Sequence, residues 1–171
     1  MTSLRPILWA LLIGFMLIGC GKKGYRDAGD GRIHFAEPDI SINVGPEWLQ
    51  IDSVPKGFCS PSMVGKAGII QTYWARAEFP DTEAIIAEVK KGNSDSSFKE
   101  REFRSTAGLQ GKFCSFLRSP TKSNEPEIRT SKIIVPTHSG RLLILDLIGP
   151  NGSIHETARA AIVQTLANGQ Q

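Results

Sequence analysis

The segment 141–148, with the sequence RLLILDLI, restricts the possible folds more than any other part of the chain, because it is apolar on both faces of a strand. Side chains alternate between the two faces of a strand with a period of two. One face carries Leu143, Leu145 and Leu147, and the other carries Leu142, Ile144 and Ile148. A strand that is apolar on both faces lies in a sheet that is covered on each side. We therefore expect this segment to be a central strand.

The segments around this strand predict antiparallel pairing. The segment 127–136 reaches 141–148 through a short turn that contains Gly140, and 101–109 is joined to 112–118 through another short connection. Two strand-forming runs separated by a short glycine-containing connection indicate a hairpin. Residues 40–44 and 67–79 also alternate like strands, and in the second of these Tyr73 and Trp74 lie on opposite faces. Together these segments predict a mostly antiparallel sheet of about five to seven strands.

Two segments carry the signals of helices. Asp81 is expected to cap a helix that ends at Gly92. Ser153 and Glu156 have the spacing of a capping box at the start of a second helix. The apolar stripe of this second helix is formed by Ile154, Ala158, Ala161, Ile162 and Leu166. The sequence thus predicts an α+β fold in which at least two helices pack on the sheet.

The composition agrees with one ordinary globular domain. Of the 171 residues 40% are hydrophobic and 22% are charged, which excludes a collagen-like chain, a disordered chain and a protein with many membrane spans. The formal net charge is +3, but basic and acidic residues alternate, as in 99–102. We find no sequence-local basic patch and therefore expect no nucleic-acid partner.

The N-terminal segment departs from this even composition. Residues 7–19 form an unbroken apolar run, and Arg5 is the one charge before it. As a helix this run would be about 20 Å long, whereas the hydrocarbon core of a bilayer is roughly 30 Å thick. It therefore predicts a signal peptide over residues 1–19. The alternative interpretation is an N-terminal anchor helix.

The residues at the end of this run indicate which class of signal peptide it is. Leu17-Ile18-Gly19-Cys20 resembles the bacterial lipobox, in which a small residue precedes a lipidated cysteine. The resemblance implies that diacylglycerol is attached to Cys20, that the chain is cleaved before Cys20, and that the new amine is acylated. The implied partner is the lipid bilayer of the cell envelope, with the domain in the periplasm. Gly21, in place of aspartate, favours the outer membrane over the inner one by the same resemblance.

The remaining chain divides into two parts. Residues 20–32 contain the lipidated cysteine and are rich in glycine and charge, which predicts a flexible tether. Residues 33–171 have the length of a single α+β domain.

Lipidation of Cys20 would leave two other cysteines, Cys59 and Cys114. An even pair in an exported domain favours a disulfide between them. Two buried thiols are the alternative. Neither cysteine lies in a CxxC or nucleophile motif, so we expect no catalytic cysteine.

The three histidines, His34, His138 and His155, fall in different predicted elements without the spacing of a metal site. We therefore expect no metal and no cofactor, and we assign no catalytic residue. His155 is expected to face away from the apolar stripe of its helix. Asp146 interrupts the central strand and has two interpretations. It is either a perturbed acid that acts as a ligand or base, or a structural carboxylate near the strand end with a salt bridge or hydrogen bond.

Two stretches carry a second resemblance. Ile42-Asn43-Val44-Gly45-Pro46-Glu47-Trp48 and the segment from Ile133 to Leu166 resemble the PsbP-like fold, which includes small DcrB-type bacterial lipoproteins. This resemblance implies an α/β/α sandwich and a non-enzymatic binding role.

The expected function is that of a lipid-anchored envelope protein that acts as a binding or accessory module with an unidentified envelope protein partner. Trp74 is the candidate anchor for that partner if its ring is exposed, because interfaces favour tryptophan. Cover by a helix or loop is the alternative for this residue. Two other functions stay open: a small hydrolase or metal-dependent enzyme that uses Asp146 with His138 or His155, and a structural component of the envelope.

Overall fold

The computed structural model describes residues 25–27, 31–35, 40–45, 47–51, 54, 56–93, 97–118 and 126–168. The elements in chain order are β1 (Tyr25–Asp27), β2 (Arg32–Phe35), β3 (Ile40–Asn43), β4 (Leu49–Ile51), β5 (Met63–Gly65), β6 (Gly68–Trp74), α2 (Thr82–Gly92), β7 (Lys99–Arg104), β8 (Gln110–Arg118), β9 (Ile128–Pro136), β10 (Leu142–Pro150), α3 (Ser153–Thr165) and β11 (Ala167–Asn168). The apolar run 7–19 and the predicted lipidation site Cys20 lie outside the described residues.

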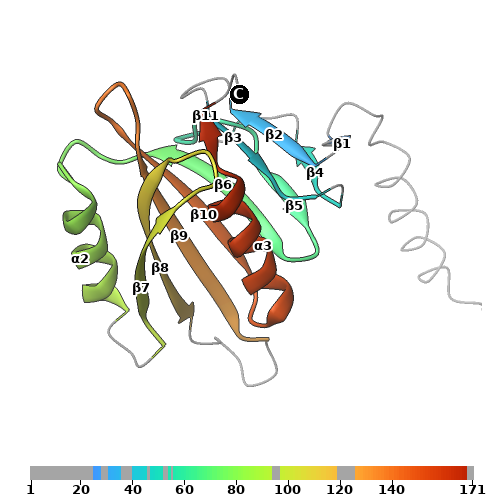
Figure 1. The fold of residues 1–171 in the computed structure, drawn as a ribbon. Helices are drawn as coiled ribbons and strands as arrows, with labels where there is room; N and C mark the ends of the chain where they lie inside the picture. Colours follow the sequence, from blue (N-terminus) through green and yellow to red (C-terminus); the bar gives the residue numbers. More distant parts are fainter. Residues whose placement is uncertain are drawn as a thin grey trace, which may run out of the picture.

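The described strands form two antiparallel sheets (Figure 1). The large sheet has eight strands in the order β1-β4-β5-β6-β10-β9-β8-β7, and the small sheet has three in the order β11-β3-β2. The predicted central strand is confirmed, since β10 lies between β6 and β9. Both predicted hairpins are confirmed as well, because β9 pairs with β10 and β7 pairs with β8.

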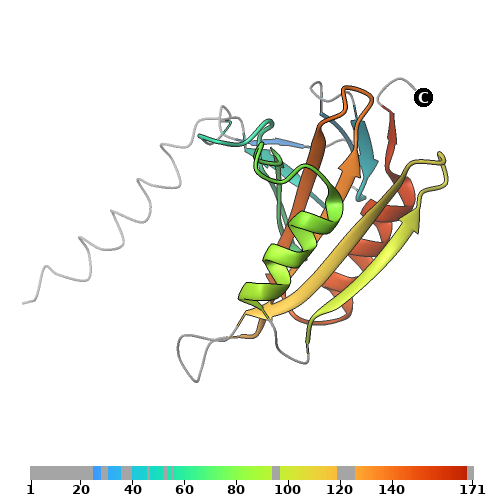
Figure 2. The same ribbon diagram turned by 90° about the vertical axis from the view of Figure 1, so that its left-hand side faces the viewer.

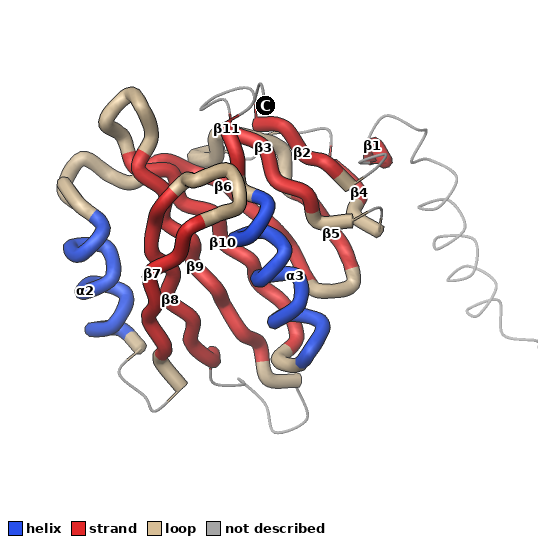
Figure 3. Tube along the Cα trace, in the orientation of Figure 1, coloured by secondary structure: helices blue, strands red, loops and turns tan. Residues whose placement is uncertain are grey.

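The helices α2 and α3 cover opposite faces of the large sheet (Figures 2 and 3). On one face, Ile85 and Ile86 of α2 pack in a cluster that includes Ile144 of β10. On the other face, Ile162 of α3 packs with Leu145 of β10, and the small sheet joins the same cluster. The residues of β10 thus enter two separate cores in alternation, which explains why the strand is apolar on both sides. The predicted α+β fold is confirmed.

The large sheet has more strands than the sequence predicts. Three of them, β1, β4 and β5, are only three residues long, and an alternating pattern cannot be recognised over so few residues. These strands extend the sheet beyond β6. One of them, β1, lies within the predicted tether and pairs with β4, with Tyr25 opposite Ile51.

β6 is shorter than the predicted strand 67–79 and ends at Trp74. The backbone N–H of Ala75 still donates to the carbonyl of Leu142 at 2.9 Å. The N–H of Phe79 then donates to the carbonyl of Arg76 at 2.9 Å, which closes a turn. This turn directs the chain away from the sheet and toward α2.

Close packing of backbones fixes the other end of β6. Gly68 has φ +126°, and a Cβ added there would lie 1.9 Å from the carbonyl oxygen of Ile148. A Cβ added to Gly149 would lie 1.9 Å from the carbonyl oxygen of Ala67. Only glycine allows the two strands to approach this closely.

The start of α2 agrees with the prediction. The carboxylate of Asp81 accepts a hydrogen bond from the backbone N–H of Ala84 at 2.8 Å. The helix includes Gly92 as its last residue, and Asn93 caps it.

The start of α3 differs from the prediction. Its N-cap is Gly152, and no side chain caps the helix. The predicted capping box is wrong, because the carboxylate of Glu156 instead forms ion pairs with Arg129 and Arg159. Two guanidinium groups are stronger partners for a carboxylate than a backbone amide is.

Candidate binding cleft between α2 and the sheet

A row of polar residues crosses the face of the large sheet on which α2 packs. The strand register places Lys132 of β9 between Cys114 of β8 and Asp146 of β10, and it places Asp146 beside Gln71 of β6. Residues that lie opposite one another in neighbouring strands share one face of a sheet. The row therefore brings together side chains that are far apart in the sequence.

Lys132 and Asp146 form a buried ion pair in the middle of this row. The ammonium of Lys132 lies 2.7 Å from Oδ1 and 2.8 Å from Oδ2 of Asp146, and Asp146 is 8% exposed. The hydroxyl of Tyr73 donates to Oδ2 of Asp146 at 2.8 Å and accepts a short hydrogen bond from Lys132. The prediction that Asp146 is a structural carboxylate with a salt bridge is thus confirmed. Its predicted place near the strand end is wrong, because Asp146 lies in the middle of β10.

The electrostatics of this group favour hydrogen bonding over proton transfer. Burial, together with the negative charge of Asp146, raises the pKa of Tyr73 well above its ordinary value. Burial also raises the pKa of the Cys114 thiol to about 12, and the charge of Lys132 opposes only part of this shift. A general base or nucleophile needs a pKa near the operating pH or below it. Neither the phenol nor the thiol meets this requirement.

A cleft of about 440 Å³ opens between α2 and the strands above this ion pair. Its lining residues come from β6 and the segment after it, from the connection between β4 and β5, from α2, and from the central strands. They are Gly57, Phe58, Tyr73, Trp74, Ala75, Arg76, Phe79, Ile85, Glu88, Val89, Lys132 and Ile144. The lining is mostly apolar, with the polar atoms of Tyr73 and Lys132 among it. Small-molecule sites commonly combine an apolar concave wall with a few placed polar groups.

Trp74, the predicted partner anchor, lies in the lining of this cleft. Its ring is half-buried, and the guanidinium of Arg141 stacks over it at 4.0 Å from the ring centroid. Phe58 contacts Tyr73 edge to face, with ring centroids 5.7 Å apart. The tryptophan is thus partly covered. Its side chain packs against the core on the α3 side of the sheet, on the face opposite to Tyr73, so Trp74 lies at the edge of the cleft rather than in its aromatic wall.

The structure does not join the two cysteines of the predicted disulfide. Cys114 is fully buried in the cluster beneath α2, whereas Cys59 packs against the cluster on the opposite face of the sheet. The disulfide was predicted from cellular compartment, which carries no information about the sheet that separates the two side chains in this structure.

The histidines do not assemble a site with Asp146. His155 is fully buried on the α3 face, where its Nε2 lies 2.9 Å from the hydroxyl of Ser131. His138 is exposed in the turn between β9 and β10. The predicted hydrolase or metal site of Asp146 with either histidine is therefore not formed. No group of three or more metal-ligating side chains occurs among the described residues.

The predicted orientation of His155 is wrong. The sequence pattern assigned Ile154 to the buried stripe of its helix, but Ile154 is 59% exposed. The buried residues of α3 are His155, Ala158 and Ile162, at i, i+3 and i+7. A polar ring takes the first position of the stripe because Ser131 supplies a hydrogen-bond partner for it.

Two residues of the cleft, Lys132 and Tyr73, carry polar groups that the sequence analysis did not single out. For Lys132, the predicted hairpin of 127–136 and 141–148 is enough to predict its position next to Asp146. Counting back from its turn places Lys132 opposite Asp146, as the register shows. The position of Tyr73 depended on which strand flanks β10 on its other side, and this is a question of topology.

Comparisons with known proteins add no family. No protein-family model matches the chain, and no curated protein matches it. Among the described residues, no helix has the length and apolar character needed to cross a bilayer.

Proposed function

We propose that this protein is a lipid-anchored bacterial envelope protein that acts as a non-enzymatic binding module, with the cleft beside α2 as its ligand site. The cleft is the observation that carries the binding role, because it combines aromatic walls with a fixed group of hydrogen-bonding atoms. The resemblance of Leu17-Ile18-Gly19-Cys20 to the lipobox supports the anchor and the envelope location. The PsbP-like resemblance supports a binding role without catalysis.

The charges that face the cleft define the ligand class. The charge of Lys132 is neutralised by Asp146, and Arg76 at the rim pairs with Glu78 at 3.4 Å. Glu88 of α2 is the remaining charged group of the lining. Among the described residues that line the cleft, each cation is already paired with a carboxylate, so an anionic ligand gains no free cation from this lining. The site therefore fits a predominantly apolar, uncharged small molecule. Its polar edge would donate a hydrogen bond to the Tyr73 hydroxyl oxygen, because the three donors of Lys132 and the one donor of Tyr73 are already used.

Occupancy of the cleft is measurable with the neutral fluorophore phenylnaphthylamine, which is apolar and aromatic. We expect Val89→Trp, which places a large ring in the cleft, to weaken binding of this probe about tenfold or more to the full-length protein. Ala87→Trp adds the same ring to an exposed position of α2 and serves as the matched control. Equal binding by both variants and the parent protein would place the ligand elsewhere.

The anchor has a separate test. Metabolic labelling with a fatty acid followed by mass analysis should show acyl chains on the parent protein and none on Cys20→Ala. The variant should also retain residues 1–19, because the cleavage that the lipobox implies follows lipidation. Acylation of Cys20→Ala would contradict the assignment of Cys20.

A further inference from the structure

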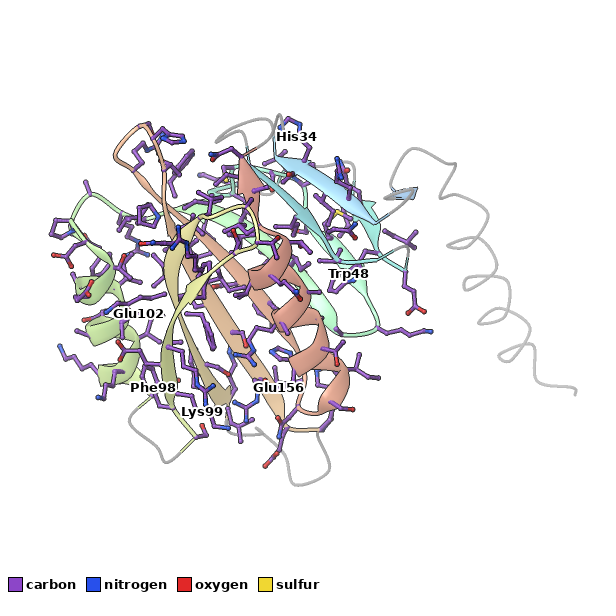
Figure 4. All side chains as sticks on the ribbon, in the orientation of Figure 1. His34, Trp48, Phe98, Lys99, Glu102 and Glu156 are labelled. Carbon is purple, nitrogen blue, oxygen red and sulfur yellow. The ribbon has the colours of Figure 1, made fainter. Side chains whose placement is uncertain are left out.

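A second site lies on the opposite face of the sheet, where β7 and α3 begin. Lys99 and Arg101 of β7 lie opposite Ser115 and Phe113 of β8 in the strand register. Phe113 belongs to the core on the α3 side, so these two cations point to that side of the sheet. In Figure 4, Lys99 and Glu156 lie at the same end of the molecule, beside the first turns of α3.

These residues enclose a small polar pocket. It has a volume of about 120 Å³ and is lined by Lys99, Arg101, Phe113, Ser115, Glu156 and Arg159. At roughly 30 Å³ for each molecule, such a space holds about four waters. It therefore has room for one small tetrahedral group and not for a drug-sized molecule.

The cations in and beside this pocket outnumber the anions. Arg129 donates from Nη1 to the Ser115 hydroxyl at 3.0 Å, so its guanidinium adjoins the pocket from below. Glu156 is the one carboxylate in the lining, and it is shared between Arg129 at 3.7 Å and Arg159. Within the described part of the chain, Lys99 and Arg101 take part in no ion pair. Four cations thus face a single carboxylate, which leaves a local charge of about +3.

The arginine of α3 is held in place before any ligand arrives. Its guanidinium stacks over the ring of Phe113 at 4.4 Å from the centroid, and Glu156 fixes one of its terminal nitrogens. The Nε of Arg159 is buried and has no hydrogen-bond partner. A guanidinium that is already held in place loses little conformational freedom when its exposed nitrogens bind an oxyanion.

From these contacts we propose that the pocket between β7 and α3 binds a phosphate group, carried by free phosphate or by a phospholipid headgroup. Phosphate matches the site in three respects: its size fits the enclosed volume, its charge offsets the excess of cations, and its oxygens accept from several donors at once. This site is independent of the cleft beside α2, because the large sheet separates the two.

The test titrates the acylated mature protein, in a neutral detergent at fixed ionic strength, with inorganic phosphate in a calorimeter. We expect saturable binding to the parent protein and about tenfold or greater weakening in Lys99→Gln/Arg101→Gln, which alters only exposed residues of the edge strand. Arg104→Gln is the matched control, because it removes a charge from the same strand but on the other face. It should change the affinity less than about twofold.

Short-chain lipids separate the two sources of phosphate. Tighter binding of soluble dihexanoyl phosphatidylglycerol than of inorganic phosphate would assign the site to a headgroup, and equal or weaker binding would assign it to free phosphate. Absence of saturable phosphate binding by the parent protein would overturn the proposal. An equal loss of affinity in Arg104→Gln would also overturn it, because general surface charge would then account for the binding.

Discussion

Lys132 and Asp146 depend on each other because both charges are largely withdrawn from water. Their side chains are 12% and 11% exposed, and Tyr73 occupies part of the remaining hydrogen-bonding capacity of each. A buried charge without its partner is strongly destabilising, whereas replacement of both charges by apolar groups is often neutral. The pair is therefore better explained as a means of orienting groups in the cleft than as a source of net stability.

This asymmetry gives a prediction for the pair. Lys132→Met should lower the free energy of unfolding by about 3–5 kcal/mol, because it leaves the Asp146 carboxylate buried and alone. The double variant Lys132→Met/Asp146→Leu should recover most of that loss. Urea denaturation at neutral pH of the parent protein, Lys132→Met, Asp146→Leu and the double variant measures both effects. A double variant whose loss equals the sum of the two single losses would show that the charges do not interact.

Burial of His155 makes the free energy of unfolding depend on pH in the acidic range. Burial, aided by the positive charges of Arg129 and Arg159, lowers the pKa of this imidazole to about 4, although Glu156 opposes the shift. In the unfolded chain the imidazole takes up a proton near pH 6.5. Between these two values unfolding is coupled to proton uptake, so the free energy of unfolding falls as the pH falls. The contribution of His155 is fully present above about pH 6.5.

His155→Gln removes this titration and keeps a polar partner for Ser131. On lowering the pH from roughly 7 to roughly 5, the parent protein should lose about 2 kcal/mol more stability than the variant. Chemical denaturation at the two pH values gives the comparison. Parallel pH dependence in both proteins would mean that the native imidazole is protonated as easily as the unfolded one.

At the scale of elements, α2 is the part of the fold most dependent on a single local signal. It forms one wall of the cleft, and the carboxylate of Asp81 is its one side-chain N-cap. Asp81→Ala should lower the free energy of unfolding by about 1 kcal/mol, and Asp81→Ser should retain most of it, because the hydroxyl also accepts from a backbone amide. Thermal unfolding of the three proteins measures the difference. A loss in Asp81→Ala no larger than that in Asp81→Ser would show that the cap hydrogen bond is not the source of the loss.

Strong periodic signals explain which elements the sequence predicts well. β10 alternates between two apolar faces over nine residues, and β9 and β10 meet at a short turn. These features depend only on local geometry, and the structure confirms them. The strands β4 and β5 and the start of α3 depend on tertiary contacts instead. The burial of His155 belongs to the same class, because Ser131, its partner, lies on β9.

The candidate site was predictable only in part, for a reason that concerns the whole molecule. Asp146 stood out because a carboxylate interrupts an apolar strand, and its partner Lys132 follows from the hairpin register. Tyr73 comes from β6, which pairs with the other edge of β10, and no local pattern specifies that neighbour. Topology decides which side chains meet on each face, and it places the cleft and the cationic pocket on opposite sides of one sheet.

The same topology predicts the chemistry of the cysteines. Cys114 is fully buried beneath α2, and its thiol has a pKa raised by burial to about 12, so little reactive thiolate forms near neutral pH. Cys59→Ser leaves Cys114 as the one cysteine that is not lipidated. In this variant, maleimide should label Cys114 only after denaturation. Mass analysis of native and denatured samples gives the comparison. Rapid labelling of the native variant would show that the sheet does not shield Cys114.

The parent protein supplies the complementary measurement. Because the large sheet separates the two sulfurs, peptide mapping without reductant should recover Cys59 and Cys114 in separate peptides. A peptide pair linked through these two cysteines would contradict the arrangement of the two cores, since one of the side chains would have to leave its own face of the sheet. Whether Cys59 and Cys114 are linked therefore tests whether their side chains lie in separate cores on opposite faces of the large sheet.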